Sequence, residues 1–150
     1  MTLTISSPVN GTVIPLADVP DPVFAEALVG PGTAIDPGNS SFVTALAPVS
    51  GTLTSLKPHA FVIVTEAGPG VLVHLGIDTV ELQGDGFTMH AEVGQAVHTG
   101  DRLITWDTAP ARTAGRSLVV PVVVLEAEAD SLTVTEKGAV SAGERLIDSV

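Results

Sequence analysis

Apolar and polar residues alternate over several short stretches of this chain, and glycine or proline ends most of them. A period of two predicts strands at Phe61–Thr65, Val71–Ile77 and Ser131–Glu136. The segment Leu118–Ala129 begins as a continuous apolar run and ends in alternation, which predicts another strand. Only Asp21–Gly30 fits a helical turn, with the aspartate as N-cap, the following proline at the first helical position and the last glycine closing it.

Two pairs of similar segments recur at nearly the same offset. Ser7–Val13 (SPVNGTV) resembles Ala47–Leu53 (APVSGTL), and Val97–Ile104 (VHTGDRLI) resembles Val140–Ile147 (VSAGERLI). The repetition predicts a duplicated β unit. Residues 1–150 are therefore expected to form one all-β domain, a sandwich or partly closed barrel with at most short helical turns.

Composition narrows the function classes. The chain contains no cysteine, which excludes a disulfide framework, a thiolate zinc site and a cysteine nucleophile. Its formal net charge of −11 disfavours nucleic acid and anionic membranes as partners. The same charge suits a basic protein partner, or serves solubility alone. With no signal-peptide pattern and no apolar run of ~18 residues, the cytoplasm is the expected compartment.

Four histidines are the candidate reactive groups, and two of them stand out. His90 follows a glycine-rich turn and His98 lies within a turn, and both are expected to be solvated. His59 opens one predicted strand and His74 lies within the next, with a glycine-rich turn between them. If Val64 pairs with Pro69 in a hairpin, His59 lies opposite His74, with Cβ atoms ~4.5–5.5 Å apart. The two imidazoles are then expected to meet on one face of the sheet.

The alternation around His74 predicts its surroundings. Leu72 and Gly76 share its face, and the absent side chain of Gly76 is expected to leave space beside the imidazole. Val71, Val73, Leu75 and Ile77 form the opposite, core-facing side. The pattern also fits a histidine that is merely satisfied at a sheet surface.

Two kinds of chemistry suit a pair of imidazoles. One is zinc binding by His59, His74 and Asp78, but zinc prefers four ligands and the H-x-H element of comparable zinc peptidases is absent. The other is nucleophilic catalysis, in which one neutral imidazole accepts a phosphoryl group. The second imidazole then donates a hydrogen bond to the phosphoryl oxygens, and an acidic rim at Asp78, Glu81 and Asp85 receives a basic donor protein.

The segment Val73–Phe87 (VHLGIDTVELQGDGF) resembles the phosphorylation-site signature of the glucose-family IIA component of the bacterial sugar phosphotransferase system. His59–Phe61 (HAF), Val19–Ile35, the APVSGT segment and EVGQAVHTGDRLI match further family segments, so the resemblance covers nearly the whole chain. It implies an antiparallel β-sandwich with internal duplication. It also implies a phosphocarrier that needs no cofactor, although a zinc ion bridging His59 and His74 stays open.

The resemblance implies partners and roles. The phosphocarrier protein HPr is expected to phosphorylate His74, His59 to support the transfer, and a cysteine of a IIB domain to receive the group. Pro20–Val29 matches an apolar docking surface, with Val23, Phe24, Leu28 and Val29 as the expected contacts. Alternatively, these four side chains pack in the core. The residues expected to form the partner surface are Asp21, Val23, Phe24, Leu28, Val29, Leu72, Gly76, Asp78 and Glu81. Regulatory targets are a further possible set of partners, and a direct membrane anchor is not expected.

The chain departs from the family pattern at a few positions. Leu72 and Leu75 stand where phenylalanine is frequent, so the pocket is expected to stay apolar with less stacking. Lys57 stands two residues before His59, where a hydroxyl residue is frequent. Lys57 either approaches the phosphoryl group or points into water.

Overall fold

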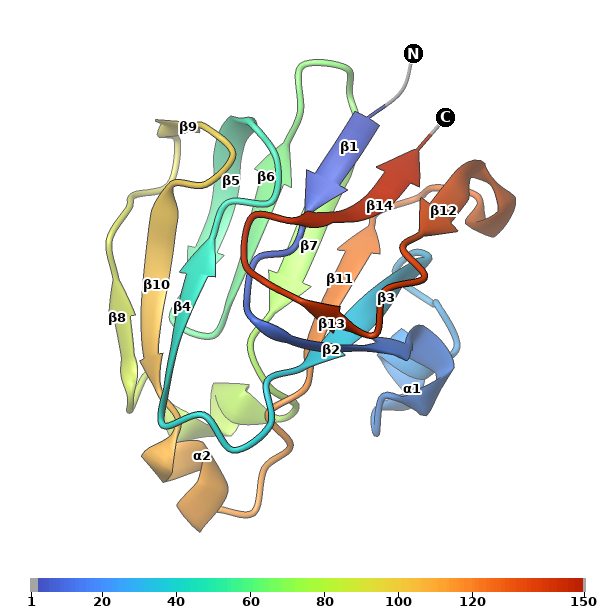
Figure 1. The fold of residues 1–150 in the computed structure, drawn as a ribbon. Helices are drawn as coiled ribbons and strands as arrows, with labels where there is room; N and C mark the ends of the chain where they lie inside the picture. Colours follow the sequence, from blue (N-terminus) through green and yellow to red (C-terminus); the bar gives the residue numbers. More distant parts are fainter. Residues whose placement is uncertain (1–2, 150) are drawn as a thin grey trace.

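The computed structural model describes residues 3–149, which form short antiparallel strands joined by tight turns (Figure 1). Its helical elements are η1 (Leu16–Asp18), α1 (Pro22–Ala25), η2 (Thr79–Leu82), α2 (Ala109–Thr113) and η3 (Ala129–Ser131). Its strands are β1 (Leu3–Ser6), β2 (Gly11–Pro15), β3 (Gly32–Asp36), β4 (Phe42–Leu46), β5 (Gly51–Lys57), β6 (Ala60–Val64), β7 (Gly70–His74), β8 (Phe87–Met89), β9 (Ala96–Val97), β10 (Arg102–Asp107), β11 (Val120–Val124), β12 (Leu132–Val134), β13 (Ala139–Val140) and β14 (Arg145–Ser149). No helix among the described residues is long and apolar enough to cross a membrane.

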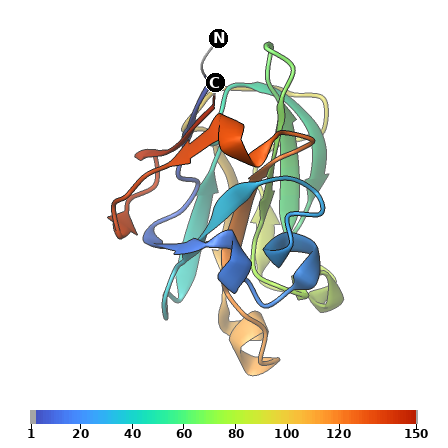
Figure 2. The ribbon, with the colours of Figure 1, turned by 90° about the vertical axis from the view of Figure 1, so that its right-hand side faces the viewer.

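The strands form one large sheet and two small ones. The large sheet has the order β13-β2-β3-β11-β7-β6-β5-β9, and the small sheets have the orders β1-β14-β12 and β4-β10-β8. Figure 2 shows the green strands of the large sheet on one side of the molecule and β1 and β14 on the other. This arrangement confirms the expected all-β, antiparallel sandwich.

The predicted duplication is visible in the strand pairing. The first repeat pairs β2 with β13 and β1 with β14, and the second pairs β5 with β9 and β4 with β10. The two units meet at their proline turns through matching hydrogen bonds, from Leu46 N–H to the Pro8 carbonyl and from Ser6 N–H to the Pro48 carbonyl, both 2.9 Å. Similar sequences therefore occupy equivalent places in the fold.

The large sheet is covered on both faces. Its inner face packs against the small sheets in a core that includes Val73, Val122 and the buried Trp106. Its outer face carries a second apolar cluster, formed by Leu16, Val19, Phe24, Ala34, Ile77 and Val123. Because β11 contributes to both clusters, all of its residues are buried, which explains its continuous apolar run.

Several predicted elements end earlier in the structure than expected. The helical turn ends at Ala25 rather than at Gly30, because Ala27 adopts a left-handed conformation (φ 55°) and its N–H bonds back to the Phe24 carbonyl at 2.9 Å. β11 ends at Val124, just before the left-handed Glu126 (φ 59°).

The strand predicted over Val71–Ile77 is also shorter. β7 spans Gly70–His74, because Gly76 turns the chain with a φ of 79°. Ile77 consequently leaves the alternation and packs in the outer cluster, so its predicted place in the main core was wrong.

Candidate functional site

His74 is the last residue of β7 and lies on the outer face of the large sheet. Its strand neighbours Val71 and Val73 point into the main core, whereas Leu72 packs against the outer cluster. The ladder between β7 and β11 ends at Val73, and the next residue of β11 is Pro121, which has no N–H to donate. Pro121 thus ends the pairing between β7 and β11 just before His74.

The turn after β7 fixes the orientation of the His74 ring. The Nδ1 atom lies 2.6 Å from the Gly76 carbonyl oxygen, which accepts hydrogen bonds only, so Nδ1 carries the proton. Thr79 is fully buried and donates its hydroxyl to the Leu75 carbonyl at 2.6 Å, which holds the turn in place. The lone pair of the neutral ring is therefore on Nε2.

His59 reaches His74 by a different route from the predicted one. The observed hairpin pairs Val64 with Gly70 and Ala60 with His74, a shift of one residue from the expected register. His59 lies in the turn between β5 and β6, where its carbonyl accepts the Leu75 N–H at 2.7 Å. Because His59 lies in a turn, strand alternation does not decide on which side of the sheet its ring lies. The two imidazoles therefore still meet, with centroids 5.0 Å apart at an interplanar angle of 70°.

Helix α1 places a phenylalanine against the same ring. The Asp21 carboxylate caps the helix by accepting the Val23 N–H at 2.9 Å, and Pro22 begins it, as predicted. One turn later, the Phe24 ring lies 5.3 Å from the His74 ring, centroid to centroid, and is itself only 7% exposed. The cap thus positions an aromatic wall beside the imidazole.

Burial and charge act in opposite directions on His74. Burial lowers the pKa of the imidazole below its usual value, while the Gly76 hydrogen bond and the negative charges of Asp21 and Asp78 raise it partly back. Burial also lowers the pKa of His59, and the nearby His74 and Lys57 lower it further. Both rings are therefore neutral at pH 7, and the acidic groups favour a positive charge on His74 when one forms.

The remaining predicted surface residues differ in exposure. Val23 and Leu28 are 43% and 68% exposed and are free to meet a partner. Val29 and Leu72 are half-buried against the outer cluster. Asp21 is also half-buried, and Asp78 is exposed.

Two of the expectations need correction. Phe24 packs in the core beneath the surface, which was the alternative for the apolar docking segment. Gly76 is buried and leaves no space beside the imidazole, because an added Cβ would lie 2.5 Å from Thr79 Cγ2 and 3.1 Å from Trp106. Glu81 belongs to η2, forms an ion pair with Arg116 and keeps its side chain 58% exposed, so its place on the partner surface stays a prediction.

The sequence analysis missed Val80 as a candidate contact residue. This side chain is 57% exposed on η2, between Asp78 and Glu81. Its position between the two expected rim residues Asp78 and Glu81 could have indicated it. However, η2 is too short to give a helical pattern in the sequence, so the exposure of Val80 was not predicted. Val80 and Val23 thus present apolar surface from the two helical elements that flank the site.

The donor groups near His74 are too few for a complete metal centre. Within residues 3–149, no group of three or more His, Cys, Asp or Glu side chains is arranged to hold a metal ion. The zinc hydrolase alternative, which needed His59, His74 and Asp78 together, loses its ligand set. What the arrangement offers instead is one oriented, neutral imidazole whose Nε2 carries the lone pair, with a second imidazole beside it.

Comparisons with known proteins agree with this geometry. The family described as "phosphoenolpyruvate-dependent sugar phosphotransferase system, EIIA 1" matches residues 3–130. The glucose permease IIA structure from Mycoplasma capricolum superposes with a TM-score of 0.90 at 35% identity, covering 99% of this chain and 96% of that one.

Two curated relatives differ in length. The "PTS system glucose-specific EIIA component" of Oceanobacillus iheyensis is 36% identical, over 97% of this chain and 88% of the relative. The "PTS system glucose-specific EIICBA component" of Streptococcus pneumoniae is 45% identical over 91% of this chain, which spans only 19% of that protein. The similarity thus extends both to separate proteins and to one segment of a longer chain.

Proposed function

The chain belongs to the EIIA family of phosphocarriers in the phosphoenolpyruvate-dependent sugar phosphotransferase system, and on that premise we propose that His74 carries the phosphoryl group. The observation that supports this assignment is the 2.6 Å contact between His74 Nδ1 and the Gly76 carbonyl. It fixes the tautomer before the donor arrives, so Nε2 needs no proton removal to act as nucleophile.

The proposed transfer balances without a further co-reactant. The Nε2 lone pair of His74 forms a bond to phosphorus while the bond between phosphorus and the donor histidine breaks, and the donor ring keeps that electron pair. Nδ1 keeps its proton, so the phosphorylated ring of His74 is positively charged. The Gly76 carbonyl, Asp21 and Asp78 favour that charge. A ring in this state is a good leaving group when an acceptor thiolate attacks phosphorus.

His59 is proposed to steady the phosphoryl group. Its ring is half-buried, and its centroid lies 5.0 Å from that of His74, close enough for an N–H to reach a phosphoryl oxygen. Such a donor stabilises charge that develops during transfer. Because the nucleophile itself is held by Gly76, loss of His59 is expected to slow the relay without preventing acceptance.

HPr is the proposed phosphoryl donor, and a cysteine of a IIB domain is the proposed acceptor, in the cytoplasm. The net charge of −11 and the exposed Asp78 suit a basic donor surface. Exposed Val23, Leu28 and Val80 supply apolar contact area around the site. The name of the streptococcal relative joins A, B and C components in one chain, which supports a IIB partner.

We propose that the relay needs no resident metal ion. A zinc ion between His59 and His74 would find two nitrogen ligands and would take the others from solvent or a second protein. Since His74 Nδ1 is occupied by Gly76, such an ion would bind Nε2, the same atom that accepts phosphorus. Zinc and phosphoryl transfer are then mutually exclusive at this site.

The test uses the whole chain, phosphorylated HPr and a separate IIB domain. His74→Gln is expected to abolish uptake of the phosphoryl group, and His59→Gln to retain uptake but slow donation to IIB. His90→Gln is the matched control, because His90 is exposed and hydrogen-bonded to Thr105, and is expected to behave like the unmodified chain. Full phosphorylation of His74→Gln would overturn the assignment.

A further inference from the structure

The strand register brings one cation to the proposed phosphorylation site. Lys57, the last residue of β5, pairs with Ala60 of β6, and Ala60 in turn pairs with His74 of β7. Residues directly opposite each other in antiparallel strands point to the same face of the sheet. Lys57, Ala60 and His74 therefore form one row across the outer face.

The geometry of that row lets the lysine reach the histidine. Two strand spacings of ~4.8 Å separate Lys57 from His74, and the residue between them, Ala60, carries only a methyl group. Lys57 is exposed, and its four-carbon stem is flexible enough to extend over that methyl group. The ammonium charge already acts on the neighbouring ring, since it helps to lower the pKa of His59.

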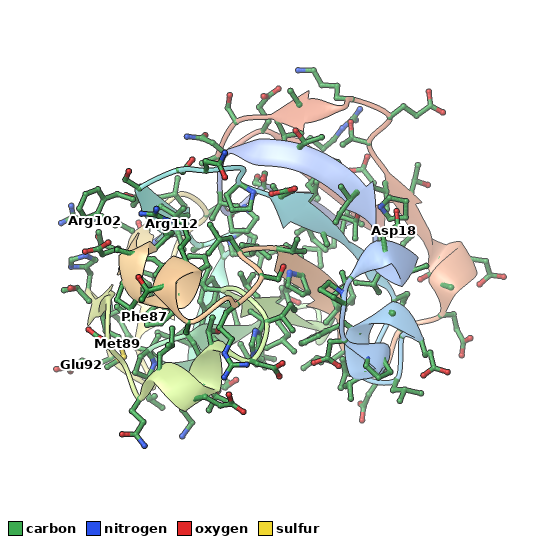
Figure 3. All side chains as sticks on the ribbon, turned by 90° about the horizontal axis from the view of Figure 1, so that it is seen from below. Asp18, Phe87, Met89, Glu92, Arg102 and Arg112 are labelled. Atoms are coloured by element: carbon green, nitrogen blue, oxygen red, sulfur yellow. The ribbon has the colours of Figure 1, made fainter. Side chains whose placement is uncertain are left out.

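The charge distribution makes this lysine conspicuous. The chain has only six Lys and Arg residues against seventeen Asp and Glu residues. Three of the six lie in carboxylate ion pairs, namely Arg116, Lys137 and Arg145. Figure 3 shows Arg102 and Arg112 at the left of the view and Asp18, the last residue of η1, at the right. Among residues 3–149, Lys57 is in no ion pair with a carboxylate.

The site itself needs a positive charge once phosphorylated. A phosphoryl group carries about −1.5 to −2 charges at pH 7. Asp21 and Asp78 lie near His74 and repel that charge, although they favour a positive ring. A neutral His59 donates a hydrogen bond but supplies no formal charge.

We propose that the Lys57 ammonium binds the oxygens of the phosphoryl group on His74 Nε2. This inference rests on the proposed function. The contact is an ion pair with hydrogen bonds: it forms no covalent bond and moves no proton, and the phosphorus–nitrogen bonds change as described above. Lys57 thus stabilises the phosphorylated chain and lowers the pKa of the phosphoryl group.

The test compares the chain's two lysines, which makes a matched control. Lys57→Met removes the charge and keeps an unbranched side chain, whereas Lys57→Arg keeps the charge. Lys137→Met removes the other lysine, which precedes β13 and is separated from β7 by β2, β3 and β11 in the large sheet. Each variant is phosphorylated by phosphorylated HPr, and the phosphoryl group is titrated by phosphorus NMR.

A charge-assisted hydrogen bond of the usual strength changes the pKa of the group it binds by about one unit, or an equilibrium constant by a factor of about ten. Lys57→Met is expected to raise the pKa of the phosphoryl group by about one unit and to lower the equilibrium constant for phosphorylation about tenfold. Lys57→Arg is expected to restore most of both values, and Lys137→Met to change neither.

Two failures are distinguishable in this experiment. If the unmodified chain takes no phosphoryl group from HPr, the proposed function itself is wrong. If it does, but Lys57→Met shows the same phosphoryl pKa and the same equilibrium constant, the phosphorylation site stands and Lys57 is a solvated strand-end residue.

Discussion

Replacement of Gly76 by alanine tests how the turn after β7 holds the reactive ring. Gly76 has a φ of 79°, and its carbonyl oxygen accepts the His74 Nδ1 proton at 2.6 Å. A Cβ at this position would lie 2.5 Å from Thr79 Cγ2 and 2.9 Å from the Ser117 carbonyl oxygen. The Thr79 side chain has no easy escape, because it is fully buried and bonded to the Leu75 carbonyl.

Two costs add up in this variant. A left-handed conformation costs an alanine about 1–2 kcal/mol. Overpacking of a filled site costs about 1–3 kcal/mol more. The free energy of unfolding of Gly76→Ala is therefore expected to fall by about 2–5 kcal/mol, and its Tm by roughly 5–15 °C. Because the carbonyl must shift away from Nδ1, phosphoryl acceptance is expected to slow about tenfold in the fraction that stays folded.

The assay is urea unfolding followed by the fluorescence of Trp106, the only tryptophan and fully buried. Gly115→Ala is the matched control, since Gly115 has a φ of 74° and no atom within 4 Å of an added Cβ. The control is expected to lose about 1–2 kcal/mol, from the backbone conformation alone. Equal midpoints for Gly76→Ala and Gly115→Ala, with equal rates of phosphoryl acceptance, would refute the reasoning.

The other predictions concern charge around the imidazoles. Asp21→Asn keeps a good N-cap but removes the negative charge, so NMR titration is expected to show a lower pKa of His74 with an unchanged free energy of unfolding. Asp21→Ala is expected to lower the pKa of His74 in the same way and also to lower the free energy of unfolding by about 1 kcal/mol, because it loses the cap. An unchanged pKa of His74 in both variants would contradict the electrostatic account. Because burial lowers the pKa of both His59 and His74, the unfolded chain binds protons that the folded chain does not, and stability is expected to fall as the pH drops from about 6.5 toward the folded values. Unfolding midpoints at several pH values check this, and the double variant with glutamine at both positions should show a flatter dependence. Zinc retention, measured by equilibrium dialysis, is expected to weaken on phosphorylation, and equal retention would argue against a shared Nε2.

Much of the fold follows from local sequence patterns. Alternation and the two pairs of similar segments predicted a duplicated β unit. The prediction succeeded because the similar segments form the same turns and strands at equivalent places around the two proline turns. The Asp-Pro pair correctly marked the start of α1. Its end was mispredicted, because the left-handed residue is Ala27, and alanine gives no local sign of that conformation.

The site depended on features that have no local pattern. Opposed histidines were expected from a strand register that is wrong by one residue, and the rings meet because His59 lies in a turn. Gly76 was expected to leave open space beside the imidazole. Instead, its carbonyl orients the His74 ring, and Thr79, Ser117 and Trp106 fill the space that a side chain at this position would need. Packing of this kind joins residues far apart in sequence, such as Gly76 and Ser117, and sequence periodicity does not report it.

The central claim is that the phosphoryl group resides on Nε2 of His74. It is tested most directly by phosphorylating the chain, with its histidines labelled with nitrogen-15, by HPr and locating the phosphorus–nitrogen coupling by NMR. The account predicts a coupling to Nε2 of His74, with the Nδ1 proton still present. A coupling to Nδ1 of that ring, or to any other histidine, would contradict it.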